Sequence, residues 1–366
     1  EVGLLVASAS TAVLLVGLFA GALVDRSRRR PLMIVADAIR AVLLLSIPAA
    51  AFTGNLGMEQ LYVVSFLEAA LGSVFDVAYR TYLPSLLSKD QLLEGNAKIG
   101  MTSAIAEVGG PGFAGALVQL ITAPMAMLVD AISYVFSAVS IGLIHAPEQG
   151  VEDVEGPSGL RRQLAEGFRA VWGHPLLRPM ALASVTGALF GNFYYALYGL
   201  FALNVLGLSP LLLGLVVSAG GVGSLAATGL VGPLTRRFGY GPTIVWTRVG
   251  SALLAVLTPL AGGPPLVAAG FLFIPQLFGD GLSTIGQIDQ LTVRQQVTPG
   301  RLLGRVNATL HVLLEGVGPI GALVGAGLAE AFGLRTAIWI SVAGSIAGLA
   351  FLIFSPLRTL RAVASQ

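Results

Sequence analysis

Long apolar runs alternate with short polar gaps along the whole chain. A helix needs about 20 apolar residues to cross the hydrocarbon core of a bilayer, and the runs have about that length. Gly, Pro and Asn occupy several short gaps, as in residues 53–57, and favour tight connections. The pattern predicts an all-α polytopic membrane protein with eleven membrane-spanning helices. They are expected at residues 2–24, 31–52, 59–80, 97–121, 125–146, 178–203, 210–233, 241–261, 265–293, 303–329 and 334–356.

Positive charge is concentrated in every second gap. All but three of the 21 lysines and arginines lie in or beside these gaps. Because loops rich in Lys and Arg remain in the cytoplasm, the basic gaps are expected to face inward and the C-terminus to be cytoplasmic. The exceptions are Arg335, beside an outer gap, and Arg40 and Arg248, which lie within spans.

Composition agrees with a chain that has lipid as its solvent. Hydrophobic residues make up 55% and charged residues 11%, whereas soluble domains carry about 25% charged residues. The net charge of +2 comes from the basic loops, so no nucleic-acid partner is expected. The absence of cysteine excludes disulfides and Cys-based metal sites, the three histidines are too scattered for a metal motif, and no phosphate-binding loop is present. We therefore expect no enzymatic activity and no cofactor. An ion gradient should supply the energy for any transport. The expected partners are the lipid bilayer and a small amphipathic substrate, and the protein is expected to be a monomer.

One long polar stretch divides the chain. We expect an N-terminal bundle at residues 1–146, a cytoplasmic linker at 147–177 and a C-terminal bundle at 178–366. Apolar residues recur in the linker at helical spacing, which predicts an amphipathic helix. It would either lie on the inner leaflet or serve only as a linker. The apolar residues are Leu160, Leu164, Phe168, Val171 and Trp172.

The two halves contain related segments. Residues 21–31, which close the first span, correspond to residues 232–239, which close the seventh span 211 positions later, and residues 107–111 correspond to 315–319. Internal repeats of this kind are typical of transporters, because two similar bundles can move about a central site.

At these repeated segments the chain resembles the major facilitator superfamily. The loop that carries Gly21, Leu23, Asp25, Arg26, Arg29 and Arg30 matches the family's motif between its second and third helices, with Arg28 in place of a glycine. Residues 75–78, 96–97, 110–111 and 174–178 resemble the branch of macrolide and siderophore (enterobactin-type) exporters. The resemblance covers the whole chain and implies twelve helices in two pseudo-symmetric bundles. The first family helix would then be absent, and the spans found here would be helices 2–6 and 7–12.

The basic loop is a candidate cytoplasmic gate. The resemblance implies that Asp25 meets the second half near Gly304 and that Arg26 or Arg29 reaches Asp76. Alternatively, the arginines only maintain the orientation of the protein in the membrane. The gating candidates are Gly21, Asp25, Arg26, Arg29, Arg30 and Asp76.

Four acidic residues near the middle of spans are candidates for proton coupling. An isolated charge there costs at least about 2.5 kcal/mol, and a buried carboxylate can take up and release protons near neutral pH. A structural ion pair or hydrogen bond, with Arg40, Arg248, Asp37 or a backbone carbonyl as partner, is the alternative. The candidates are Glu107 and Glu315, which occupy equivalent positions and rank first, followed by Glu68 and Asp280.

Small residues and prolines mark two candidate hinges, at Gly110 and Pro111 and at Gly318 and Pro319. The first resembles the family's antiporter motif and favours export; without the resemblance, packing alone would explain both.

Polar and aromatic residues in two later spans are candidates for the substrate cavity, although an interfacial role explains the tyrosines equally well. They are Asn192, Tyr194, Tyr195, Tyr198, Gln276 and Gln287.

These features together predict a proton-coupled secondary exporter in a bacterial inner membrane. It would exchange protons for hydrophobic or amphipathic small molecules, such as drugs, macrolides or siderophores, by alternating access. An uptake permease, a lipid flippase and a membrane scaffold subunit without transport activity remain as alternatives.

Overall fold

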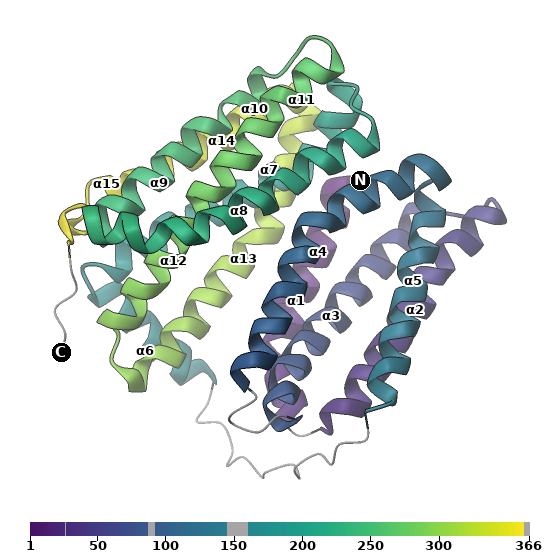
Figure 1. Cartoon of the computed structure of the whole chain (residues 1–366), viewed down its shortest axis with the longest axis horizontal. Helices are drawn as coiled ribbons and strands as arrows, with labels where there is room; N and C mark the ends of the chain where they lie inside the picture. The colour runs from purple at the N-terminus through teal and green to yellow at the C-terminus, as the bar shows by residue number, and fades with distance from the viewer. Residues whose placement is uncertain (26, 87–91, 145–159, 362–366) are drawn as a thin grey trace. The chain divides into compact units, whose positions relative to one another are not determined.

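The computed structural model describes residues 1–25, 27–86, 92–144 and 160–361 (Figure 1). All regular elements in these ranges are helices. Ten helical segments are long and apolar enough to cross a membrane, so the chain is a multi-pass membrane protein. The first predicted span coincides with helix α1 (Val2–Asp25), of which only Val2–Gly17 meets a shorter apolar criterion. Ten of the eleven predicted spans are therefore confirmed as helices that can cross a membrane.

Contacts between Cα atoms divide the chain into two compact units. The first comprises Glu1–Ala106 and Ala116–Pro157, and the second comprises Glu107–Gly115 and Ser158–Gln366. In the first unit, α2 packs against α3 and α5, and α1 packs against α3. Buried apolar side chains, among them Met33, Val74 and Ala78, join these helices. The other helices of this part of the chain are α2 (Arg29–Phe52), α3 (Met58–Leu86), α5 (Ala123–Gly142) and α4 (Leu92–Ile121), whose middle segment Glu107–Gly115 belongs to the second unit.

The second unit has its main core around Phe193, Phe201, Leu272 and Ile338, whose side chains are almost fully buried. Helix α7 packs against α13 and α14, and α12 packs against α8 and α9. The elements are α6 (Leu160–Gly173), α7 (Leu177–Leu200), η1 (Phe201–Val205), α8 (Pro210–Phe238), α9 (Tyr240–Ala255), α10 (Leu257–Leu260), α11 (Pro265–Ile274), η2 (Pro275–Gly279), α12 (Asp280–Val297), α13 (Gly300–Phe332), α14 (Leu334–Gly348), α15 (Ala350–Ile353) and η3 (Pro356–Thr359).

Local sequence explains where helix α8 begins and ends. The Ser209 hydroxyl accepts a hydrogen bond of 3.2 Å from the Leu212 amide, and Pro210 follows at the first helical position. Both features favour a helix start. At the other end Gly239 adopts a φ of +90°, which side chains with a Cβ rarely tolerate, and the chain turns directly into α9.

Glycines allow α8 and α13 to approach their neighbours closely. A methyl group on Gly223 of α8 would overlap the carbonyl oxygen of Leu277 in η2, and one on Gly321 of α13 would overlap that of Leu189 in α7. In a membrane, helix association depends on such close packing, because lipid removes the hydrophobic driving force between helices. These crossings set the positions of η2 and α13.

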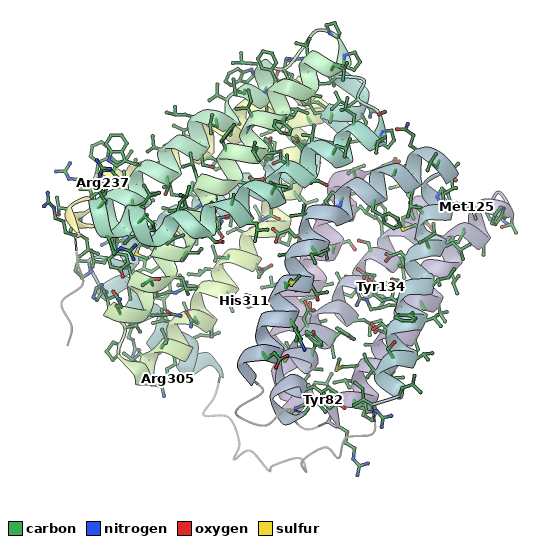
Figure 2. All side chains as sticks on the ribbon, viewed as in Figure 1. Tyr82, Met125, Tyr134, Arg237, Arg305 and His311 are labelled. Carbon is green, nitrogen blue, oxygen red and sulfur yellow. The ribbon has the colours of Figure 1, made fainter. Side chains whose placement is uncertain are left out.

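The predicted amphipathic helix forms as α6 and packs against α13 (Figure 1). Val171 is fully buried with Leu177 and Val306, and the Glu166 carboxylate pairs with Arg305 of α13 (Figure 2). Phe168 and Trp172 remain exposed and stack with ring centroids 4.4 Å apart. The apolar side of α6 is therefore divided between a helix contact and an exposed aromatic pair.

Candidate functional site

The second unit contains a cavity of about 250 Å³. Helices α7, α9, α12 and α14 and the turn η2 contribute to its wall. A second hollow of about 700 Å³ shares Ser184, Tyr195, Arg248 and Gln290 with it. Polar residues on the wall of the first cavity include Tyr194, Tyr195, Tyr198, Arg248, Gln276, Asp280, Ser283 and Gln290.

Asp280 owes its position to a break in the ninth predicted span. Pro275 lacks an amide proton and its ring excludes the regular helix hydrogen bond, and the chain forms the π-helical turn η2 before α12 begins at Asp280. Gly220 of α8 leaves room for the Asp280 carboxylate, since a methyl group there would overlap it. Among the described residues, no side chain forms a hydrogen bond or ion pair with this carboxylate. Asp280 is thus a carboxylate in a cavity wall that has room for a partner.

Three tyrosines of α7 lie on the same cavity wall. The Tyr194 hydroxyl and the Thr258 hydroxyl are 2.9 Å apart, and the Tyr194 and Tyr198 rings have centroids 5.3 Å apart. The Tyr198 hydroxyl is buried without a hydrogen-bond partner among the described atoms. Tyr195 is 73% exposed and meets Tyr194 edge to face. The rings provide an aromatic surface close to a carboxylate.

Arg248 of α9 also lines the cavity. Its Nη1 donates to the Ser283 hydroxyl and its Nη2 to the Gln290 amide oxygen, both over 3.4 Å, and its Nε is buried without a partner in the described structure. Of the other predicted cavity residues, Gln276 lies in η2 on the wall of the first cavity, and Gln287 lines the second hollow and donates to Ser283 over 3.1 Å. Asn192 lines neither of the two and donates to the Ala188 carbonyl.

Glu68 lies in the first unit and has partners. The Nε and Nη2 of Arg40 donate to its Oε1, the former over 3.0 Å, and the Tyr134 hydroxyl donates to the same oxygen over 3.0 Å (Figure 2). The Arg40 guanidinium lies 4.1 Å from the centre of the Tyr134 ring, and the Asp37 carboxylate is 3.6 Å away. This is the structural ion pair that the sequence left open as an alternative for Glu68.

The two equivalent acids differ in their surroundings. Glu107 of α4 is exposed, and Glu315 of α13 is partly buried. Neither forms an ion pair with a described residue. Of the predicted hinges, a methyl group on Gly318, next to Pro319, would lie 3.6 Å from the side chain of Asn192 in α7. A methyl group on Gly214 of α8 would overlap the carbonyl oxygen of Pro111, next to Gly110. Both predicted hinges therefore lie where helices pack closely.

A comparison with protein families decides the class of the molecule. The profile described as Major Facilitator Superfamily matches residues 1–309. The chain belongs to this family. The multidrug efflux pump Tap of Mycolicibacterium fortuitum is 26% identical over 344 residues, which cover 90% of this chain and 81% of that protein. Tap of Mycobacterium tuberculosis is also 26% identical, with 79% of its length covered.

Solved structures show the same fold. A bacterial homologue of the iron transporter ferroportin in an inward-facing state aligns with a TM-score of 0.68 at 18% identity, covering 95% of this chain and 89% of that one. The nucleoside transporter NupG aligns with a TM-score of 0.70 at 14% identity, covering 96% and 90%. The major facilitator fold and its use in transport are thus established for this chain.

The family's basic loop is described in part. Arg26 lies outside the described residues, as do the side chain of Asp25 and the surroundings of Gly21. Arg30 donates to the carbonyl oxygens of Ile141, over 3.1 Å, and Gly142 at the end of α5, where helix carbonyls lack partners and a cation is favourable. Asp76 is exposed and Arg29 is partly buried. Arg30 therefore caps a helix in the first unit, and the gating role remains a prediction.

Sequence reasoning missed several polar residues at the cavity and near it. Asp280, Ser283, Gln287 and Gln290 recur at intervals of three and four, which places them on one face of a helix; this spacing could have identified Ser283 and Gln290. Asp289, almost fully buried, accepts from the Thr235 hydroxyl over 2.8 Å and 3.0 Å, and no local pattern predicted that pair.

Proposed function

We propose that this major facilitator transporter is a proton-coupled exporter of hydrophobic or amphipathic small molecules in a bacterial inner membrane. Its C-terminus would face the cytoplasm, and substrate and protons would cross in opposite directions by alternating access. The observation that carries the proposal is Asp280, whose carboxylate has no side-chain partner in the described parts of the chain and lies on the wall of a cavity that also presents three tyrosine rings. Its relatives named as multidrug efflux pumps support the direction and the breadth of substrate.

Asp280 is the preferred site of proton coupling. An exchanger needs a group that binds either a proton or the substrate, and an unpaired carboxylate in a low-dielectric cavity can alternate between them. Glu68 already accepts hydrogen bonds from Arg40 and Tyr134, so protonation of Glu68 would break its ion pair with Arg40. Glu107 and Glu315, the candidates ranked first from the sequence, lie outside the cavity wall.

The apolar and aromatic parts of the wall suit an amphipathic substrate. Ala183, Ala252, Ala255 and Leu352 line the cavity with the tyrosines. A mostly apolar site with few polar groups binds such molecules by burial and orients them by a small number of polar contacts. Rings next to a carboxylate also favour a positively charged group on the substrate.

Transport into liposomes tests the proposal. Purified protein is reconstituted, an acidic lumen is imposed, and accumulation of a fluorescent amphipathic dye is followed, with protein-free liposomes as the measure of passive partition. An exchanger lets protons leave the lumen as dye enters, so the wild type should accumulate dye. Accumulation driven only by an alkaline lumen would instead identify a permease that carries protons and substrate together.

The variant Asp280→Asn separates coupling from binding. It should lose dye accumulation driven by the proton gradient by at least about tenfold, while dye still equilibrates down its own gradient. Glu68→Gln serves as the matched control and should retain gradient-driven accumulation in the fraction that folds. Full coupling in Asp280→Asn would refute the assignment of Asp280.

A further inference from the structure

Arg248 is a positive charge within a membrane span and has no acidic partner among the residues that the structure describes. A guanidinium in this environment is energetically costly and normally pairs with a carboxylate or with backbone carbonyls. The described part of the chain places no carboxylate within ion-pair distance of Arg248, and its Nε has no acceptor. Its two hydrogen bonds, at 3.4 Å, are long.

In the first unit, the arginine within a span is neutralised by an acidic residue of the same unit. Arg40 lies on α2, and the offset of 211 positions between the matching loops of the two halves relates α2 to α9. Arg40 is bound by Glu68 and lies near Asp37. Asp37 corresponds to Arg248 in that repeat. The second unit therefore has a cation where the first has an acid, and its described residues supply no acid to neutralise it.

The surroundings of Arg248 suit an anion. Ser283 and Gln290 hold the two terminal nitrogens, and the Ser184 hydroxyl lies 3.5 Å from the same Gln290 oxygen. Gly286 allows α12 to lie against the Arg248 side chain, since a methyl group there would be 3.3 Å from Cγ. The guanidinium is thus supported along its length while it lines the cavity.

We propose that Arg248, with Ser283 and Gln290, forms an anion subsite for a carboxylate group of the exported molecule. A planar guanidinium binds a carboxylate through two parallel hydrogen bonds and is hard to replace by a point charge. Asp280 lies on the wall of the same cavity, so the preferred substrate is amphoteric, with a cationic group toward Asp280 and the tyrosines and a carboxylate at Arg248. This inference rests on the proposed export function, because it concerns the same cavity.

A matched pair of dyes tests the subsite. Rhodamine B carries a cationic ring system and a free carboxylate, and its methyl ester lacks only the anionic charge. Binding of each dye to the purified protein is measured by fluorescence polarisation. The wild type should bind the acid at least about tenfold more tightly than the ester, since a charge-assisted hydrogen-bonded pair has about that effect.

Two variants should remove this preference by different routes. Arg248→Gln deletes the cation, and Gln290→Glu places a carboxylate beside it, which occupies the guanidinium without removing it. Both should bind acid and ester with similar affinity, and Arg248→Lys should retain only part of the preference. If Arg248→Gln fails to fold, Gln290→Glu still decides the question, with its folding checked by gel filtration.

The outcomes separate the subsite from the export proposal. An acid preference that persists in both Arg248→Gln and Gln290→Glu, or that is absent in the wild type, would overturn the subsite. Gradient-driven accumulation of the ester in liposomes tests export alone, because the ester does not use Arg248. For both variants the expected result is loss of the acid preference, with gradient-driven accumulation of the ester still well above that of protein-free liposomes.

Discussion

The guanidinium of Arg40 in α2 and the carboxylate of Glu68 in α3 form an ion pair between two membrane-spanning helices, and the hydroxyl of Tyr134 in α5 forms hydrogen bonds with both side chains. Three helices of the first unit are joined at this point. Since α2 packs against both α3 and α5, the pair connects the helix to its two neighbours.

Replacement of one partner should cost more than replacement of both. Glu68→Gln leaves Arg40 charged and without its acceptor, and should destabilise the protein by about 3 kcal/mol. The double variant Arg40→Gln, Glu68→Gln should lose less unfolding free energy than Glu68→Gln alone, because no isolated charge remains. Denaturant unfolding in detergent of the wild type, both single variants and the double variant measures these losses. Lys98→Gln, which breaks an exposed pair with Glu94 at 2.7 Å, should cost less than about 1 kcal/mol; strictly additive losses would show that Arg40 and Glu68 do not interact.

The contact between α8 and η2 should tolerate no side chain at Gly223. Gly223→Ala would drive a methyl group into the Leu277 carbonyl, and overpacking of this kind costs about 1–3 kcal/mol. Gly229→Ala on the same helix has no atoms within 4 Å of the new methyl group and should be neutral or slightly stabilising, since Ala favours helix. Thermal unfolding of the two variants in parallel measures the difference. Equal behaviour would contradict the close crossing.

Arg335 should stabilise the end of the second unit at which α10 meets α14. Its Nη1 donates to the carbonyl oxygens of Pro259 and Ala261 over 2.7 Å, and its guanidinium lies 5.2 Å from the centre of the Phe201 ring. Arg335→Gln should lose about 2 kcal/mol of unfolding free energy, because buried carbonyls are left without a donor. Arg358→Gln, at an exposed site, should change it by less than about 0.5 kcal/mol. A similar loss in both would argue against the capping role.

The attachment of α6 to α13 should depend on Gly167. A methyl group there would overlap the Arg305 carbonyl and the Thr309 hydroxyl, whereas Gly173 in the same helix has open space. Gly167→Ala should raise hydrogen exchange of the α6 amides by about tenfold, because loss of the helix contact leaves them protected only by local structure. Gly173→Ala should leave exchange at those amides unchanged. Exchange is read by mass spectrometry of peptides from α6. Protection retained in Gly167→Ala would mean that α6 is held elsewhere.

Local sequence was sufficient for ten of the eleven predicted spans and for the class of protein. Apolar length predicts helices in a bilayer because each span must satisfy its own backbone hydrogen bonds, and the helices lie where the runs do. The repeated loop at residues 21–31 and the Glu-to-Pro segments indicated the family that the match over residues 1–309 confirms. The ninth span was predicted as continuous and is divided into α11, η2 and α12, because Pro275 interrupts the regular hydrogen bonds.

Tertiary structure alone decided what each charged residue does. Arg40, Arg248, Glu68 and Asp280 all looked alike as charges inside apolar runs. Packing of α2 on α3 joins Arg40 to Glu68, and the crossing of α8 with η2 at Gly220 leaves the Asp280 carboxylate in a cavity wall. Hydrophobicity is a property of each segment by itself and can be read along the chain, whereas the partner of a charge depends on distances between residues far apart in sequence.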